Sequence, residues 1–210
     1  PEGMVRPDAV SCHPLKGSGV RPGPKFVHDV VKRSILHTCH AAHLPQGRTM
    51  CAIIIVYRCD MAVWRQRLKI AHISDLHFSS SLFVPRWADN VARAMEKERP
   101  ELLVVTGDLT NDGYASEFEA AKSFLDSLEA EDMIVVPGNH DSRNLGYTVF
   151  EEIIGPRFPT YVGRGLTVVG LDSTEPDLDD GHVGREHYGP IRERFNGPNI
   201  RIVALHHHLI

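Results

Sequence analysis

Residues 133–141 read MIVVPGNHD, an apolar run that changes abruptly into turn-forming and ligand-type residues. The apolar half is typical of a strand that is covered on both faces of a sheet. Gly138 allows the backbone to bend sharply after that strand. Asn139, His140 and Asp141 then carry an amide, an imidazole and a carboxylate, which add little to packing. We therefore interpret this stretch as a strand that ends in a functional site.

The same arrangement recurs through residues 68–210. The predicted strands are Leu68–Ile73, Leu102–Thr106, Met133–Val136, Leu166–Leu171 and Ile200–Leu205. Between them, Pro85–Glu98 and Ser116–Ala130 have the apolar spacing of amphipathic helices, and Ser116 and Glu119 have the spacing of a capping box. Strands that alternate with helices predict an α/β sheet, which binds its ligands at the carboxyl ends of the strands.

Four of the predicted strands are followed by side chains of the types that bind metal ions in proteins. These are Asp75 and His77 after the first strand, Asp108 after the second, Asn139, His140 and Asp141 after the third, and His206, His207 and His208 after the fifth. Each group alone also has an ordinary explanation, as turn residues or as solvated histidines. Carboxylate, amide and imidazole groups together suit Mn²⁺, Fe or Zn²⁺. Their recurrence at four strand ends favours a site for two divalent metal ions.

Composition separates residues 1–60 from the remainder. The first sixty residues hold eight Lys/Arg, four Asp/Glu and all four cysteines, whereas residues 61–210 hold fifteen Lys/Arg and twenty-three Asp/Glu. Residues 1–48 are rich in Pro and Gly and show little periodicity of either kind. We predict an N-terminal extension over residues 1–60, disordered or not native, with a natural start at Met61, and a domain over residues 67–210.

The same properties bear on compartment and partners. The longest apolar run, which includes Cys51–Tyr57, is far shorter than the roughly twenty residues that span a bilayer, so no membrane span is predicted. The acidic balance of residues 61–210 argues against nucleic-acid binding, which needs a basic surface. A domain without cysteine favours a reducing compartment, the cytoplasm. The oligomeric state is not predicted.

Taken in order, the ligand groups resemble the calcineurin-like metallophosphoesterase superfamily. Its pattern of D-x-H, G-D-x-x, G-N-H-[DE] and a later His is matched by Asp75-Leu76-His77, Gly107-Asp108, Gly138-Asn139-His140-Asp141 and His206. The segments ISDLH, GDLTNDG and VPGNHD look most like the cyclic-nucleotide phosphodiesterase branch. The resemblance covers residues 68–210. It implies a layered α/β sandwich in which helices flank the β-sheets.

The resemblance also implies a set of metal ligands. Asp75 and His77 would hold the first ion, Asp108 would bridge both ions, and Asn139 and His206 would hold the second. The two ions would be Mn, Fe or Zn, and would together lower the pKa of a water molecule between them.

The implied catalytic residues are His140 and Asp141. His140 would lie beside the phosphate and give a proton or a hydrogen bond to the leaving oxygen, and Asp141 would orient the imidazole of His140. His207 is a further candidate ligand. Only one of two adjacent side chains at a strand end points into a given crevice, and we prefer His206 for this position.

The implied function is the hydrolysis of a small-molecule phosphate ester, in particular a phosphodiester such as a 3′,5′-cyclic nucleotide, by a hydroxide that bridges two metal ions. The closing G-H-x-H motif of the superfamily does not occur before Ile210. We therefore expect a domain that is incomplete at its C-terminus, with two open and weak metal sites. Two alternatives stay open: a phosphomonoesterase, and a non-catalytic metal-binding or interaction module with the same fold.

Overall fold

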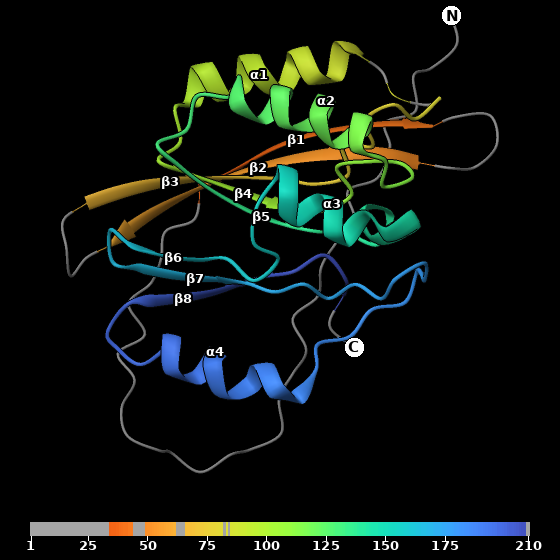
Figure 1. The fold of residues 1–210 in the computed structure, drawn as a ribbon. Helices are drawn as coiled ribbons and strands as arrows, with labels where there is room; N and C mark the ends of the chain where they lie inside the picture. Colours follow the sequence, from red (N-terminus) through yellow and green to blue (C-terminus); the bar gives the residue numbers. More distant parts are fainter. Residues whose placement is uncertain (1–33, 44–48, 62–65, 82, 84, 209–210) are drawn as a thin grey trace, which may run out of the picture. The chain divides into compact units, whose positions relative to one another are not determined.

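The computed structural model describes residues 34–43, 49–61, 66–81, 83 and 85–208. All of them belong to one compact unit, residues 31–210 (Figure 1). Two β-sheets and the helices that cover them make up the described part of this unit.

The first sheet has five strands in the order β1-β2-β3-β4-β5. They are β1 (Ser34–His43), β2 (Thr49–Met61), β3 (Gln66–Ile73), β4 (Leu102–Thr106) and β5 (Asp132–Val136). β1, β2 and β3 pair in antiparallel fashion, whereas β3, β4 and β5 are parallel. Ile73 lies opposite Val105, and Thr106 lies opposite Val136. The carboxyl ends of three strands therefore meet at one edge of the sheet.

The second sheet has three strands, β6 (Thr160–Gly163), β7 (Leu166–Gly170) and β8 (Ile200–Ala204). β6 and β7 form an antiparallel hairpin, whose turn residues Arg164 and Gly165 both have positive φ angles, 50° and 75°. Such a turn matches the right-handed twist of the two strands. β7 and β8 are parallel, so His206 and His207 follow the carboxyl end of β8.

Helices cover the outer faces of the two sheets (Figure 1). Those helices are α1 (Pro85–Glu98), α2 (Ala115–Asp126), α3 (Gly146–Ile153) and α4 (Tyr188–Arg194), with 3₁₀ helices η1 (His140–Leu145) and η2 (Arg185–His187). α1, α2 and α3 share a hydrophobic core with one face of the first sheet, and the second sheet packs on its other face. α4 lies on the far side of the second sheet.

β4 shows why the predicted strands are apolar throughout. Its side chains alternate between two cores, because successive residues of a strand point to opposite faces. Leu103 and Val105 are buried under the helices, while Leu102 and Val104 are buried between the two sheets. A strand in this position has no solvent face.

The fold class expected from the sequence, a layered α/β sandwich with helices flanking β-sheets, is confirmed. Each predicted strand lies within one residue of an observed strand's ends, except that β3 begins at Gln66, and the predicted helix Pro85–Glu98 is α1. α2 differs, because it ends at Asp126 and not at Ala130. The predicted capping box of Ser116 and Glu119 is wrong.

The N-terminus of α2 is instead held by Glu117. Its Oε2 accepts hydrogen bonds from the backbone N–H groups of Asp112 and Tyr114, at 3.0 Å each. The N-cap is Tyr114, two residues before the predicted cap Ser116, so the acidic side chain that can reach back to free N–H groups is Glu117 and not Glu119.

Among the elements after β5 that were not predicted are β6, α3 and α4. β6 has four residues at the edge of its sheet, alternately exposed and half-buried. α4 has seven residues, none of them buried, so its sequence shows no apolar stripe. Elements this short leave too little periodic signal to be recognised from sequence.

Two further strands, β1 and β2, lie in residues 1–61 and were not predicted; β1 falls where the sequence shows little periodicity, and β2 contains the apolar run Cys51–Tyr57. β1 pairs with β2 along its whole length, from Ser34 opposite Arg58 to His43 opposite Thr49, and β2 pairs with β3. This pairing uses main-chain groups, which any sequence of mixed composition can supply. Residues 1–33 lie outside the described residues. The assignment of residues 1–60 as an extension outside the domain stays a prediction.

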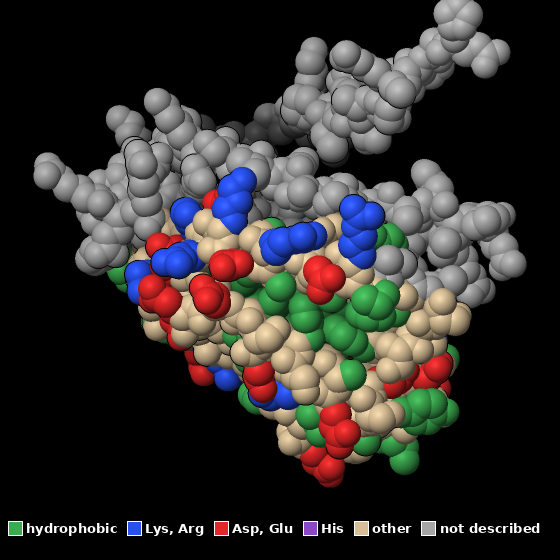
Figure 2. All heavy atoms as spheres, turned by 90° about the horizontal axis from the view of Figure 1, so that it is seen from above, with side chains coloured by type: hydrophobic (Ala, Val, Ile, Leu, Met, Phe, Trp, Pro, Cys, Tyr) green, Lys and Arg blue, Asp and Glu red, His purple; other side chains and the backbone are tan. Residues whose placement is uncertain are grey.

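The face that carries α1 and α2 shows positive and negative side chains close together (Figure 2). Charged residues such as Arg93 and Glu96 of α1 and Glu119 of α2 are exposed there. Among the residues that the structure describes, this face thus carries charges of both signs. Across the described residues, no helix combines the length and the apolar composition that crossing a membrane requires.

Candidate metal centre

The chain beyond β3 and β4 stays paired past the ends of the two strands. The backbone N–H groups of Asp75, His77 and Phe78 donate hydrogen bonds to the carbonyl oxygens of Gly107, Asp108 and Leu109, at 3.1, 2.9 and 2.8 Å. This ladder places the first two predicted metal ligands directly beside the third, at the edge where the parallel strands end.

The three residues that this ladder brings together have strained backbones. Their φ angles are positive, 61° for Asp75, 45° for His77 and 52° for Asp108. A side chain in this region costs on the order of 1–3 kcal/mol, and such strain gathers at functional sites. Here it turns three polar side chains toward one point.

Two glycines allow the ends of β4 and β5 to approach closely. A Cβ on Gly107 would lie 2.3 Å from the backbone nitrogen of Gly138, and a Cβ on Gly138 would lie 2.2 Å from Oδ1 of Asp108. Only residues without a side chain fit at both positions. The contact lets Oδ1 of Asp108 accept a hydrogen bond from the backbone N–H of His140, at 3.0 Å.

Replacing Gly138 by Ala is expected to lower the free energy of unfolding by about 1–3 kcal/mol and to weaken Mn²⁺ binding, because the new methyl group would push Asp108 out of place. Urea denaturation and titration calorimetry measure the two effects. Gly189→Ala is the matched control, since a Cβ there meets nothing within 4 Å. Equal stability and equal Mn²⁺ affinity in both variants would contradict the expectation.

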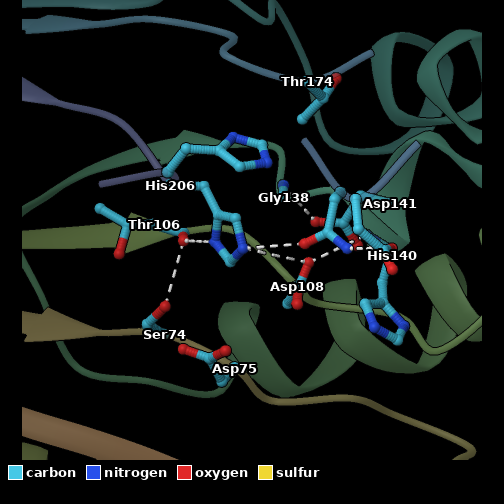
Figure 3. A network of polar contacts seen from close by, with 12 residues as sticks. Ser74, Asp75, Thr106, Asp108, Gly138, His140, Asp141, Thr174 and His206 are labelled. Carbon is cyan, nitrogen blue, oxygen red and sulfur yellow. Dashed lines mark hydrogen bonds and ion pairs between the residues drawn. The ribbon is translucent and has the colours of Figure 1, made fainter. Parts of the chain in front are cut away.

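Asp108 lies at the centre of the site, 4% exposed, with one oxygen toward each of two histidines. Oδ2 is 3.5 Å from Nε2 of His77, and Oδ1 is 3.6 Å from Nε2 of His206. Figure 3 shows the Asp108 carboxylate directed toward the His206 ring, with Asp75 close by. Oδ1 of Asp75 is 3.9 Å from Nε2 of His77, and Oδ1 of Asn139 is 3.1 Å from Nε2 of His206.

The orientation of His206 leaves a lone pair facing these oxygens. Nδ1 of His206 is 2.8 Å from the carbonyl oxygen of Thr106 (Figure 3), which can only accept, so Nδ1 carries the hydrogen. In that tautomer Nε2 has only a lone pair, and it faces oxygens of Asp108 and Asn139. Lone pairs that converge in this way fit a cation, and the mixture of nitrogen and oxygen donors suits Mn²⁺, Fe or Zn²⁺.

His140 lies on the His77 side of the site. The two rings meet edge to face with centroids 4.6 Å apart, and His77, Asp108 and His140 have ligand atoms within 4.8 Å of one another. Nδ1 of His140 is 2.7 Å from the carbonyl oxygen of Asn111. Nε2 is therefore the ring atom left for the site. A second group of three, with the same spacing, consists of Asp75, Asp108 and His206.

Asp141 is fully buried and has a different set of contacts from the one predicted. Its carboxylate accepts hydrogen bonds from the backbone N–H groups of Leu109, Thr110 and Gly138, at 3.1, 2.9 and 2.9 Å, and from Oγ1 of Thr110, at 2.8 Å. It thereby ties together the loops that follow β4 and β5. The contacts with the His140 ring, which the sequence assigned to Asp141, are made at Nδ1 by the Asn111 carbonyl and by Nη1 of Arg143, at 2.7 and 2.8 Å.

His207 points away from the other ligand residues. Its Nδ1 is 2.8 Å from Oγ of Ser173, and its Nε2 is buried without a partner among the described residues. Among the sequence-predicted residues, the structure brings together Asp75, His77, Asp108, Asn139, His140 and His206. The preference for His206 over His207 agrees with this geometry, and the role of each residue stays a prediction.

Burial shifts the acidity of three groups in the site. It lowers the pKa of His77 to about 4, with a further contribution from His140, so this imidazole is neutral at pH 7 and can bind a cation. Burial raises the pKa of Asp108 to about 6, and raises the pKa of Asp141 to about 6 with help from the charge of Asp108. Both carboxyl groups are therefore mostly ionised at pH 7.

Three residues of the site were not found from the sequence. Asn111 contacts His140 through its main chain, so its side-chain type gave no signal. Arg143 donates from Nη1 to the same carbonyl oxygen at 3.3 Å, and Asp179 accepts from Asn139 and Arg143. A single Arg or Asp in a polar segment cannot be distinguished by sequence pattern from an ordinary solvent-exposed residue.

Residues 68–209 match the family model described as Calcineurin-like phosphoesterase. The chain belongs to this family, and the resemblance stated from the motifs is confirmed. This family is one of phosphoesterases that use divalent metal ions.

Three curated relatives of the chain carry the names of phosphodiesterases. The chain is 27% identical over 161 residues to a protein of Synechococcus named "Probable cyclic nucleotide phosphodiesterase", covering 71% of this chain and 61% of that protein. It is 30% identical over 165 residues to a protein of the same name from Rhodococcus erythropolis, covering 66% and 51%. It is 33% identical over 99 residues to a glycerophosphodiester phosphodiesterase of Enterobacter lignolyticus, covering 43% and 34%. The chain thus spans about three fifths or less of the length of these relatives.

Proposed function

We propose that this protein hydrolyses a small-molecule phosphodiester, such as a 3′,5′-cyclic nucleotide, with the help of two divalent metal ions. The observation that carries the proposal is the central carboxylate of Asp108, whose two oxygens face His77 Nε2 on one side and His206 Nε2 on the other. Asp75 completes one side and Asn139 the other. The names of the relatives support a diester over a monoester.

We assign the residues of the site two roles, metal binding and proton donation. Asp75, His77, Asp108, Asn139 and His206 would hold the ions, which when bound polarise a phosphate ester and make a water molecule acidic enough to attack near neutral pH. His140 would approach the leaving oxygen with Nε2, because its Nδ1 is occupied by the carbonyl of Asn111. With a hydrogen on both ring nitrogens, it would give that oxygen a hydrogen bond or a proton from Nε2, an effect typically worth ~10²–10⁴-fold in rate.

Two buried groups would keep these side chains in place. Asp141 ties the loops that carry Asp108 and Asn139 to each other. The carbonyl oxygen of Thr106 holds the ring of His206. Partners of metal ligands such as these fix the tautomer and the direction of a ligand. The cytoplasm stays the proposed compartment.

The proposal is tested by measuring hydrolysis with the protein first stripped of metal and then supplied with Mn²⁺. Bis(p-nitrophenyl) phosphate, 3′,5′-cyclic AMP and p-nitrophenyl phosphate serve as substrates. We expect Mn²⁺-dependent cleavage of the two diesters, and no rate above background in the metal-free protein. Faster cleavage of the monoester would favour the phosphomonoesterase. Mn²⁺ binding without cleavage of any substrate would favour the non-catalytic module.

A further inference from the structure

The loop of residues 171–184, which follows β7, lies against η1. Oγ1 of Thr174 is hydrogen-bonded to Oγ of Ser142, and Oδ1 of Asp177 accepts from the backbone N–H of Asn144 at 2.9 Å. The loop folds back on itself through a bridge between Thr174 and Gly181. The loop therefore contacts the segment that follows Asn139 and His140.

Asp179 of this loop contacts a proposed metal ligand directly. Its Oδ1 accepts hydrogen bonds from Nδ2 of Asn139 and from Nη2 of Arg143, both at 2.9 Å. Arg143 in turn donates from Nη1 to the Asn111 carbonyl, the group that holds His140. Oδ1 of Asp179 is thus bonded to two residues that follow β5, Asn139 and Arg143.

The chemistry of a carboxylate decides how Asn139 must lie. An ionised carboxylate only accepts hydrogen bonds, so it must face the NH₂ group of the amide and not its oxygen. The amide oxygen then points the other way, where Oδ1 of Asn139 lies 3.1 Å from Nε2 of His206. An amide binds a metal ion through its oxygen and never through its NH₂ group. If the amide were turned over, it would present hydrogens to the ion.

We propose that Asp179 is a positioning residue, which holds the Asn139 amide with its oxygen toward the ion that would bind between Asp108, Asn139 and His206. This inference rests on the proposed metal centre. Asp179 itself does not touch that ion, and acts through Asn139. Loss of such a partner typically lowers metal affinity by about 10–100-fold.

The stability of the Asp179 variants distinguishes a positioning role from a general structural role. Its side chain is 79% exposed, and exposed ion pairs such as the one with Arg143 contribute about 0–1 kcal/mol to stability. The variants should therefore fold with nearly unchanged resistance to urea. A change in metal affinity without a change in stability separates positioning of Asn139 from general support of the loop.

The test is titration calorimetry of the metal-free full chain with Mn²⁺, on wild type and on Asp179→Ala, Asp179→Asn and Asp180→Ala. We expect Asp179→Ala to weaken one of two Mn²⁺ sites by about 10–100-fold and to leave the other unchanged. Asp179→Asn, whose oxygen can still accept from Asn139, should recover most of the affinity. Asp180→Ala, an exposed neighbour of the same charge, should behave as wild type.

A second readout is independent of bound metal. In ¹H–¹⁵N spectra of the metal-free protein, the side-chain NH₂ signals of Asn139 should move in Asp179→Ala and stay in place in Asp180→Ala. Wild-type affinity at both sites in Asp179→Ala, or equal losses in Asp179→Ala and Asp180→Ala, would overturn the inference. Wild-type protein that binds two Mn²⁺ ions but cleaves no ester would overturn the proposed function alone. Wild-type protein that binds no Mn²⁺ would overturn both.

Discussion

Replacing Asp108 by Asn is expected to lower the Mn²⁺-dependent rate of bis(p-nitrophenyl) phosphate cleavage by about 10³-fold. Metal ions contribute several kcal/mol to such a reaction, and every 1.36 kcal/mol corresponds to about tenfold in rate. Asp108 is the residue whose two oxygens face both His77 and His206, so its loss affects both proposed ions. Steady-state kinetics at saturating Mn²⁺ measures the effect.

The same variant gives a second measurement that needs no substrate. Mn²⁺ should raise the midpoint of thermal unfolding of wild type, because a ligand that binds only the folded state stabilises it. Asp108→Asn should lose most of this rise. The matched control is Asp89→Asn, an exposed carboxylate of α1, which should keep both the rate and the thermal shift. A rate within tenfold of wild type in Asp108→Asn would exclude Asp108 as a bridging ligand.

Replacing Asp141 by Ala is expected to lower the free energy of unfolding by about 3–5 kcal/mol. The substitution would leave three buried N–H groups, those of Leu109, Thr110 and Gly138, without their acceptor, and each such group costs about 1–3 kcal/mol. Urea denaturation at pH 7 measures the change.

A matched control separates this effect from the loss of any carboxylate. Asp126→Ala removes an exposed Asp of α2 that pairs with Lys122, and should cost less than about 0.5 kcal/mol. If Asp141 mainly oriented His140, as the sequence suggested, Asp141→Ala would instead keep wild-type stability and lose activity. That result would contradict the structural role derived from the four hydrogen bonds.

The sequence predicted the strand ends because there the pattern changes within two residues. The buried strand β4 ends at Thr106, and Gly107 and Asp108 cannot continue its apolar run. The parallel order of β3, β4 and β5 then follows from the alternation of strands and helices, and it places three ligand groups at one edge. Most of the proposed metal ligands could be identified in this way from the sequence alone.

The direction of side chains within the loops could not be predicted. His140 and Asp141 are adjacent, but η1 begins at His140, and consecutive side chains of a 3₁₀ helix point about 120° apart. Asp141 therefore turns into the protein while His140 faces the site. Asp179 lies 40 residues from Asn139 in a segment with no apolar pattern, so only the folded chain shows their contact.

The spacing of the ligands along the chain bears on how the protein folds. Asn139 and His206 are 67 residues apart, and His206 reaches Thr106 across 100 residues. Contacts between such distant segments form late, because the entropy of closing long loops must be overcome before they contribute. A folding intermediate that has paired only β3 with β4 would hold Asp75, His77 and Asp108 but not Asn139 and His206. An ion bound between Asp108, Asn139 and His206 would thus require both sheets to be assembled, because these residues follow strands of two different sheets.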